Sequence, residues 1–225
     1  MILATMLALA ALPDGGRLSA GTACYAIVRE TAAGPAVIGA TWQSVRESEA
    51  AGEPAWDIVV HQRVGDGAFD LRDHFVLARK DLRPIAFDSR KLGKDHVRLT
   101  YANSRITGSR LEKDAAVPVD LPAPPLVWEG NLWGLTFGAL PLAAGGEYSL
   151  PFYQYDKGFG TFTLRVTGSE MVETPKGKIE AWTVDAGTGP DKRVTYLLGK
   201  ADGAELGTRA PGFATRLGGD CTGID

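Results

Sequence analysis

His61 and His74 are the residues best suited to catalysis or metal binding, and they flank a strong hairpin motif, Gly-Asp-Gly, at residues 65–67. If the turn contains two residues, His61 lies opposite Arg72 and His74 lies opposite Val59. Both imidazoles then share one face of the hairpin, whereas a slip of one residue separates them. Two imidazoles without an obvious third ligand fall short of the three or four ligands that a zinc site needs. We therefore predict solvent-facing histidines and no metal site.

Other catalytic motifs are missing from the sequence. Asp70 and Asp73 could act as paired carboxylates, but exposed charges on a strand explain them more simply. The Gly-x-Ser-x-Gly motif of hydrolases does not occur. Two glycine pairs, at residues 158–160 and 187–189, do not lie between a strand and a helix, so they do not predict a phosphate-binding loop. We expect no enzyme activity, no catalytic residues and no cofactor.

Aromatic and aliphatic side chains point to a possible function more clearly than the titratable residues do. They concentrate in the apolar segment 126–139 and in the strand-like residues 150–167. Apolar pockets with few polar groups suit acyl chains and other hydrophobic ligands. The candidate cavity-lining residues are Trp128, Trp133, Phe137, Phe152, Phe162, Leu164 and Val166. The alternative is that these side chains simply fill the core.

Residues 140–182 show best which elements position these side chains. The residues of Thr161–Thr167 alternate, with three apolar side chains on one face and four polar ones on the other, which is typical of a half-buried antiparallel strand. Turn residues flank this strand at 156–158 (Asp-Lys-Gly) and at 175–177 (Pro-Lys-Gly). The segment therefore predicts strands joined by tight turns.

Further strand-like runs recur about every ten residues, as in a sandwich or barrel. They lie at residues 24–30, 36–45, 57–64, 69–79, 82–88, 97–101, 104–112, 192–198 and 207–217. Residues 47–54 are polar and predict a loop, and the prolines of 117–125 predict an extended connector outside any central ladder. Residues 126–139 are the best helix candidate, with glycines at 130, 134 and 138. We predict a mainly all-β protein.

The N-terminal run at residues 2–13 is apolar but too short to span a bilayer. It matches the apolar part of a secretory signal peptide, with small residues at 19–20 and 22–23 as candidate cleavage sites. We assign residues 1–20 to a signal peptide and residues 21–225 to one β domain. The alternative is a buried first strand or helix.

Two cysteines, Cys24 and Cys221, lie near opposite ends of the remaining chain. An even pair in an exported protein suggests a disulfide. The chain-entropy contribution of so long a loop is about 5 kcal/mol at most. Lipidation of Cys24 and two inert thiols are the alternatives.

Composition narrows the classes of partner. The 225 residues carry a net charge of −3 and no dense block of Lys or Arg, so we expect no nucleic-acid partner. Apolar residues make up 44% of the chain and charged residues 23%, which is ordinary for a globular protein. Segment 126–139 is interrupted by polar residues and glycines, so we predict a protein that is not transmembrane.

The order of several short motifs resembles a known family. Arg83-Pro84 comes first and is followed by a turn at Gly93, the Pro-rich connector and the apolar segment; then come residues 145–151 (GGEYSLP) and residues 174–182 (TPKGKIEAW). This order resembles the exported bacterial proteins grouped as domain of unknown function 3108, over about residues 70–217. The resemblance implies a fold related to the outer-membrane lipoprotein carriers. That fold is a strongly curved antiparallel sheet, an incomplete barrel, with a short helical lid over an apolar cavity.

These observations lead to one expected function and two alternatives. We expect an exported, periplasmic protein of the cell envelope that is not an enzyme and that binds or passes on a lipid, acyl chain or other hydrophobic small molecule. The first alternative is a structural or scaffolding protein with a filled core and an envelope protein as partner. The second is a hydrolase with an unrecognised site.

Overall fold

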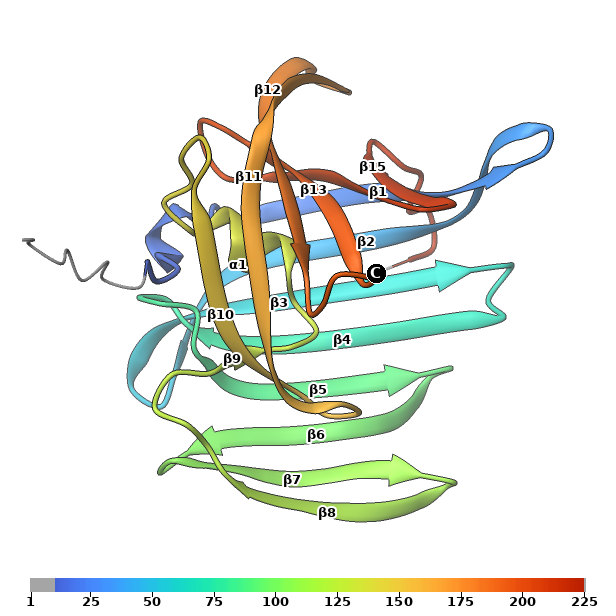
Figure 1. The fold of residues 1–225 in the computed structure, drawn as a ribbon. Coiled ribbons are helices and arrows are strands. Elements are labelled where there is room, and N and C mark those ends of the chain that lie inside the picture. The colour runs from blue at the N-terminus through green and yellow to red at the C-terminus, as the bar shows by residue number, and fades with distance from the viewer. Residues whose placement is uncertain (1–10, 225) are drawn as a thin grey trace, which may run out of the picture.

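The computed structural model describes residues 11–224, which form one large curved sheet with almost no helix (Figure 1). The strands are β1 (Gly21–Thr31), β2 (Gly34–Ala50), β3 (Glu53–Val64), β4 (Phe69–Ala78), β5 (Pro84–Lys91), β6 (Lys94–Ala102), β7 (Arg105–Glu112), β8 (Ala115–Pro122), β9 (Trp128–Glu129), β10 (Glu147–Gln154), β11 (Gly158–Thr174), β12 (Gly177–Gly187), β13 (Arg193–Gly199), β14 (Glu205–Ala210) and β15 (Phe213–Leu217). A 3-10 turn, η1 (Gly15–Arg17), and a helix, α1 (Gly134–Gly138), complete these elements.

The sheet is continuous from β8 to β9 and remains open between them. Its order is β8-β7-β6-β5-β4-β3-β2-β1-β15-β14-β13-β12-β11-β10-β9, so the first and last strands lie side by side near the middle. All neighbours are antiparallel except β9 and β10, which are parallel. The sheet curves until β10 and β11 lie in front of β1 to β5 (Figure 1). The predicted fold class, a mainly all-β incomplete barrel with a strongly curved antiparallel sheet, is confirmed.

Alternation of side chains along the strands builds the core between the two halves of the sheet. On β3, β4 and β5 the inward residues include Ile58, Phe75 and Phe87, which are neighbours across the strands. On the facing half, Leu164 and Val184 belong to the same cluster. Each of these five side chains is at most 2% exposed. Burial of apolar surface from both halves therefore holds the curvature.

The predicted helix over residues 126–139 is wrong in its extent. Residues 128–129 form the edge strand β9, and the helix is reduced to the five residues of α1. Nor does the segment cover the sheet from outside, because Phe137 and Leu140 are fully buried and α1 contacts β13 and β14. Residues 127–140, here called the plug, lie inside the curved sheet (Figure 1).

Close backbone contacts explain why the plug contains a glycine at every fourth position. A Cβ at Gly130 would collide with the carbonyl oxygen of Tyr153, one at Gly134 with the Glu205 carboxyl, and one at Gly138 with the carbonyl oxygen of Gly203. Each glycine thus brings the plug against a different strand or turn. Glycines at this spacing would share one face of a helix, but in this structure each of them makes a separate close contact.

The predicted loop at residues 47–54 is also wrong. Strand β2 continues to Ala50 and β3 begins at Glu53, which leaves a tight turn at Ala51 and Gly52. Both turn residues have positive φ, as a two-residue hairpin requires. The polar side chains of this region are therefore the exposed ends of two long strands. The Pro-rich connector, by contrast, becomes the edge strand β8, where proline is tolerated.

The predicted signal peptide, residues 1–20, falls half outside the described residues. Within its described half, the Asp14 amide donates a hydrogen bond to the Ala139 carbonyl at 2.9 Å. The buried Trp56 indole donates to the Gly15 carbonyl, also at 2.9 Å. Residues 14–15 thus join the plug to β3 and form part of the fold. A cut at residues 22–23 would fall within β1.

Cys24 and Cys221 form a disulfide, the pairing that the sequence favoured. The amide of Gly218 also donates to the Cys24 carbonyl at 2.8 Å. Farther along, the guanidinium of Arg63 donates to the Gly223 carbonyl at 2.9 Å. The C-terminal tail is therefore held against β1 and β3.

Candidate functional site

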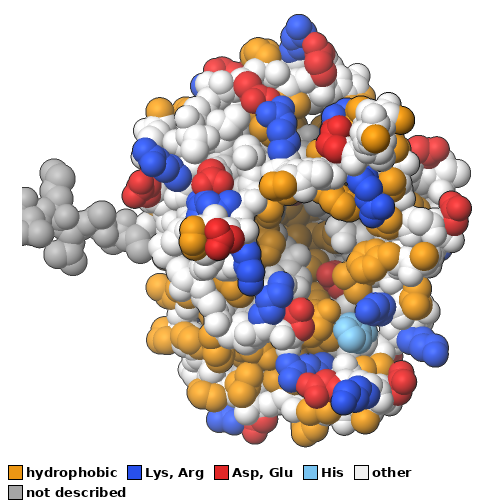
Figure 2. Space-filling model, turned by 45° about the vertical axis from the view of Figure 1, so that its right-hand side comes forward, with side chains coloured by type: hydrophobic (Ala, Val, Ile, Leu, Met, Phe, Trp, Pro, Cys, Tyr) orange, Lys and Arg blue, Asp and Glu red, His pale blue; other side chains and the backbone are white. Residues whose placement is uncertain are grey.

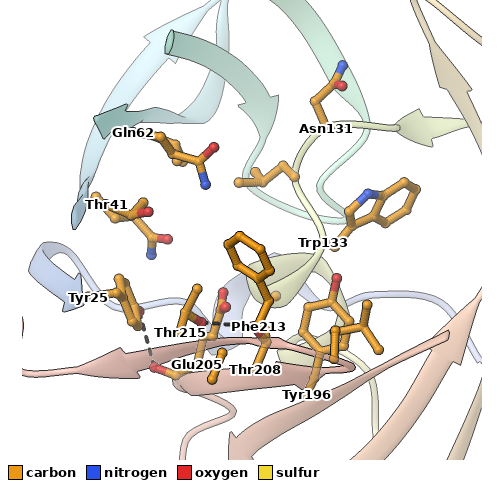
Figure 3. A pocket seen from close by; sticks show the side chains of 17 residues that line it. Tyr25, Thr41, Gln62, Asn131, Trp133, Tyr196, Glu205, Thr208, Phe213 and Thr215 are labelled. Atoms are coloured by element: carbon orange, nitrogen blue, oxygen red, sulfur yellow. Dashed lines mark hydrogen bonds between the residues drawn. The ribbon is translucent and has the colours of Figure 1, made fainter. Parts of the chain in front are cut away.

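A cavity of about 320 Å³ lies between the inner faces of β1–β3 and β13–β15 (Figure 3). Residues 131–134 of the plug close one side of it. The lining residues are Tyr25, Thr41, Gln43, Val60, Gln62, Asn131, Leu132, Trp133, Gly134, Val194, Tyr196, Glu205, Thr208, Ala210, Phe213, Ala214 and Thr215. Figure 2 shows the molecule hollowed on one face, with hydrophobic side chains inside the hollow and Lys and Arg side chains around it. The volume is at the lower end of the range for small-molecule sites.

Strand register places the polar wall of the cavity. Tyr25 of β1 pairs with Thr41 of β2, and Thr41 pairs with Gln62 of β3. One step away, Gln43 pairs with Val60. Residues directly opposite each other across antiparallel strands share a face, so these five side chains point into the same space. Hydroxyl and amide groups therefore make one wall polar.

Trp133 forms the opposite, aromatic wall. Its ring lies 3.7 Å from that of Phe162, 5.0 Å from that of Phe152 and 5.4 Å from that of Phe137, measured between centroids. Phe137 in turn lies 5.0 Å from Tyr196, edge to face. Aromatic contacts at these separations fix ring positions. The cavity wall is thus preformed by the plug and by β10, β11 and β13.

The seven residues proposed from the sequence as cavity lining have two different positions. Trp133 lines the cavity described above. The other six lie behind it in the packed interior: Trp128, Phe137, Phe152, Phe162, Leu164 and Val166. Phe137, Phe152 and Phe162 support Trp133 directly.

Glu205 contributes the carboxyl group of the cavity. Its carboxyl lies against the Cα of Gly134, and its backbone carbonyl accepts a hydrogen bond from the Tyr25 hydroxyl at 3.1 Å. Among the described residues, no hydrogen bond reaches the carboxyl itself. Burial raises its pKa to about 7. The negative charge of Glu205, together with burial as the larger cause, also raises the pKa of Tyr25 and of Tyr196.

A second buried carboxyl, Glu129, lies in the plug and is part of a hydrogen-bond network. The Tyr101 hydroxyl donates to one carboxyl oxygen at 2.6 Å and the Asn131 amide donates to the other at 2.8 Å. The Gln154 amide donates in turn to Asn131 at 2.9 Å. Burial, with a smaller contribution from Asp73, raises the pKa of Glu129 to about 7 against the effect of these donors. The network joins β6, the plug and β10.

Asp70 and Asp73 do not form a carboxylate pair, because they lie on opposite faces of β4. Asp70 points outward and Asp73 inward, where it is 8% exposed. The expectation of exposed strand charges is therefore wrong for Asp73. Ser89, which lies directly opposite it in β5, is its buried polar neighbour, and a hydrogen bond from Ser89 favours the ionised form of Asp73. Burial, followed by the charge of Asp88, raises the pKa of Asp73 to about 6.

The β3–β4 hairpin has the predicted register, with His61 opposite Arg72 and His74 opposite Val59. The two histidines share the outer face of the hairpin. No cluster of three or more potential metal-ligating side chains occurs within residues 11–224.

The prediction of solvent-facing histidines is wrong for His61, which is 8% exposed. Its Nε2 lies 2.9 Å from Asp70 Oδ1. His74 is half-buried, with its two ring nitrogens 2.8 Å from Asp88 and 2.9 Å from Asp57. The hydrogen bond to Asp88, followed by that to Asp57, raises the pKa of His74. Carboxylates on neighbouring strands thus hold both rings.

Comparison with known proteins places this chain in a family. The sequence matches the family described as protein of unknown function (DUF3108) over residues 29–211. The chain belongs to this family. No curated protein matches this DUF3108 chain. Within residues 11–224, it has no helix with the length and apolar character needed to cross a membrane.

One solved structure resembles this DUF3108 protein along nearly its whole length. It is described as a beta-barrel-like protein of domain of unknown function DUF1849 from Brucella abortus. The TM-score is 0.50 at 13% identity, and the alignment covers 93% of this chain and 96% of the other. At this identity the likeness shows the fold alone.

Sequence reasoning missed most of the cavity lining of this DUF3108 protein. Glu205 begins β14, two residues before the last strand predicted from the sequence, residues 207–217. That prediction merged β14 and β15, although the Pro211-Gly212 pair between them is a turn signal. The polar wall of β1–β3 was also missed, because Thr41 and Gln43 flank the apolar Trp42, and residue type alone would place Trp42 inside and the two polar residues outside.

Proposed function

We propose that this protein binds a hydrophobic ligand in the cavity beside the plug and does not transform it. The observation that supports this most directly is the preformed 320 Å³ cavity with an aromatic wall around Trp133. An apolar group entering it would leave water, which stabilises binding by about 25 cal/mol per Å². The polar wall would orient the ligand's head group.

The make-up of the lining favours binding over catalysis. The lining includes no His, Cys, Ser, Lys or Arg side chain. Acyl transfer by a serine or cysteine nucleophile needs such a side chain beside a base. Within the described part of the chain, no side chain is hydrogen-bonded to the Glu205 carboxyl to form a catalytic pair with it.

Export to the cell envelope is the second part of the proposal. The Cys24–Cys221 disulfide supports it, because disulfides persist in oxidising compartments such as the periplasm. The apolar N-terminal run provides the matching targeting signal. An exported carrier of hydrophobic molecules would shield them from water between membranes.

Native mass spectrometry of protein exported to a periplasm and purified without detergent tests this function. We expect added mass that is lost on denaturation and fragments as a lipid or another hydrophobic compound. A clean apo mass, unchanged after incubation with mixed lipids, would contradict the proposal and favour a scaffolding protein.

Variants of the cavity lining test whether a bound ligand occupies the cavity. Trp133→Asp places a charge on the aromatic wall and should abolish the added mass, and Ala210→Phe, opposite Phe213 on the inner face, should do the same by adding an apolar ring inside the cavity. Val37→Asp is the control, because Val37 is 70% exposed on β2. Far-UV circular dichroism establishes that each variant is folded. Retained ligand in folded Ala210→Phe would show that the ligand binds elsewhere.

A further inference from the structure

The charge of the cavity is unbalanced. Glu205 is the one ionisable acid among the lining residues, and none of them is Lys, Arg or His. Neither a hydrogen bond nor an ion pair engages its carboxyl among residues 11–224. Several other carboxylates, such as Asp70 and Asp185, have an arginine partner. A half-buried carboxylate without a partner favours a cation from solution.

Aromatic rings surround this carboxyl. Tyr25 is fixed beside it by its hydrogen bond to the Glu205 backbone, and Tyr196 is close enough for the Glu205 charge to raise its pKa. In Figure 3, Glu205 lies between Tyr25 and Tyr196, with Phe213 next to it and Trp133 on the far side. Faces of Tyr, Phe and Trp rings attract cations, and such rings form the cages that recognise quaternary ammonium groups.

We propose that the ligand of this cavity is an amphipathic cation, an ammonium or amine head group on an apolar body, with the head group bound by Glu205 and the surrounding aromatic rings. This inference rests on the proposed function and names its ligand class. The Glu205 carboxylate and the ring faces of Tyr25 and Tyr196 hold the head group, and Trp133 and Leu132 contact the apolar body. Phe213 borders the head group, and one face of its ring already contacts the Arg29 guanidinium, 5.2 Å from the ring centroid. Binding of the cation favours the ionised form of Glu205, which burial otherwise disfavours.

Because the cavity lining carries the negative charge of Glu205, anionic amphiphiles are poor ligands. A fatty-acid carboxylate would bring a second negative charge beside Glu205 with no Lys or Arg in the lining to neutralise it. Like charges brought together in a partly desolvated site oppose binding strongly. The cavity therefore selects by the sign of the head-group charge as well as by apolar surface.

Three probes with the same chain test this selection: octyltrimethylammonium, octanoate and octanol, each below its micelle concentration. Binding to the full folded protein is measured at pH 8 by calorimetry and by the change in tryptophan fluorescence. We expect octyltrimethylammonium to bind about tenfold more tightly than octanol, and octanoate to bind more weakly than octanol.

Glu205→Gln keeps the size of the side chain and removes its charge. In this variant we expect octyltrimethylammonium to lose its tenfold preference, while octanol binds as in the parent. Glu49→Gln, at an exposed position on β2, is the matched control and should keep the preference.

The outcomes separate the two proposals. If octanol binds but the cation shows no preference, or if Glu205→Gln retains the preference, the ligand class is wrong and the hydrophobic site stands. If none of the three probes binds, the proposed function itself fails. Tight binding of octanoate would likewise overturn the assignment of a cationic ligand.

Discussion

Three carboxyl groups, Asp73, Glu129 and Glu205, point into the interior of the sheet, and burial raises the pKa of each. An acid whose pKa is higher in the folded state than in the unfolded state takes up protons on folding. Its contribution to stability is complete below the unfolded pKa and is lost as the pH rises through the folded pKa. For Glu129 this range runs from 4.5 to about 7. Acids paired on the outer surface, such as Asp70, have a lowered pKa and the opposite effect. Their contribution to stability is lost as the pH falls below about 4.

We predict that the free energy of unfolding decreases from pH 5 to pH 8 and that Glu129→Gln reduces this decrease. Gln resembles the protonated side chain: its amide oxygen can accept from Asn131, and its NH2 can donate to the Tyr101 hydroxyl, which then becomes the acceptor. The variant should equal the parent at pH 5 and exceed it by about 1–3 kcal/mol at pH 8. Urea unfolding followed by tryptophan fluorescence at both pH values measures this.

Glu49→Gln again serves as control, since Glu49 is exposed and should leave the pH dependence unchanged. A Glu129→Gln protein that is less stable than the parent at pH 8 would contradict the prediction. It would show that Glu129 contributes as a charged acceptor.

Of all features, the positions and roles of individual residues could be predicted least well from the sequence. Aromatic residues such as Trp133 and Phe137 are large and apolar wherever they lie, so their burial could be expected from type alone. Alternation along β4 places Asp73 on the same face as Phe75 and Leu77. Residue type argues against this position, because a carboxyl group is expected on the exposed face.

At the scale of elements, the plug differs most from what its sequence suggests. Its apolar residues and glycine spacing resemble a helix, yet tertiary contacts at Gly130 and Gly138 decide its conformation. The strands followed their sequences far more closely. Two-residue periodicity and turn residues are local properties, as in β11 and in the β3–β4 hairpin, whereas a close backbone approach depends on a partner distant in the chain.

Gly138→Ala should destabilise the protein by about 1–3 kcal/mol, because the added Cβ would overlap the carbonyl oxygen of Gly203. Helix propensity alone predicts the opposite sign, a gain of about 1 kcal/mol for Gly to Ala within α1. Thermal unfolding measured by circular dichroism separates the two effects.

Gly189→Ala is the matched control, because no atom lies within 4 Å of the added Cβ there. That variant should unfold within a degree or two of the parent. Equal stability of the Gly138→Ala protein would mean that the plug is free to move away from the β13–β14 turn.

At the scale of the whole molecule, the curved sheet is held by its two halves and by the disulfide. β8 and β9 are free edges, so no strand ladder closes the barrel. Side-chain hydrogen bonds cross the interior instead, from Tyr101 to Glu129, from Trp128 to the Asp81 carbonyl and from Arg110 to the Tyr155 carbonyl. Fold class and curvature could be expected from strand spacing and family resemblance. The open edges could not, since they depend on which strands remain unpaired.

Replacing both cysteines by serine should lower the free energy of unfolding by about 2–4 kcal/mol, because Cys24 and Cys221 close a loop of nearly the whole chain. Chemical denaturation of the parent in reducing agent should reproduce the value for the double variant. The double variant itself should not respond to the reducing agent. If it unfolds at the same denaturant concentration as the oxidised parent, the disulfide contributes nothing to stability.

The pairing of β1 with β15 also determines the topology of the chain. Read in spatial order, the strands run from β9 to β15 and then from β1 to β8, so each strand lies beside its successor at every step but one. The exception is the pairing of β1 with β15, which joins residues as far apart as Tyr25 and Leu217. From β10 to β8 in this order, the sheet is thus a circular permutation of a simple up-and-down meander, to which β9 adds a parallel edge. A chain rejoined at its ends and opened between β8 and β9 would keep every pairing while removing its most distant contact, and sheets with local contacts fold faster.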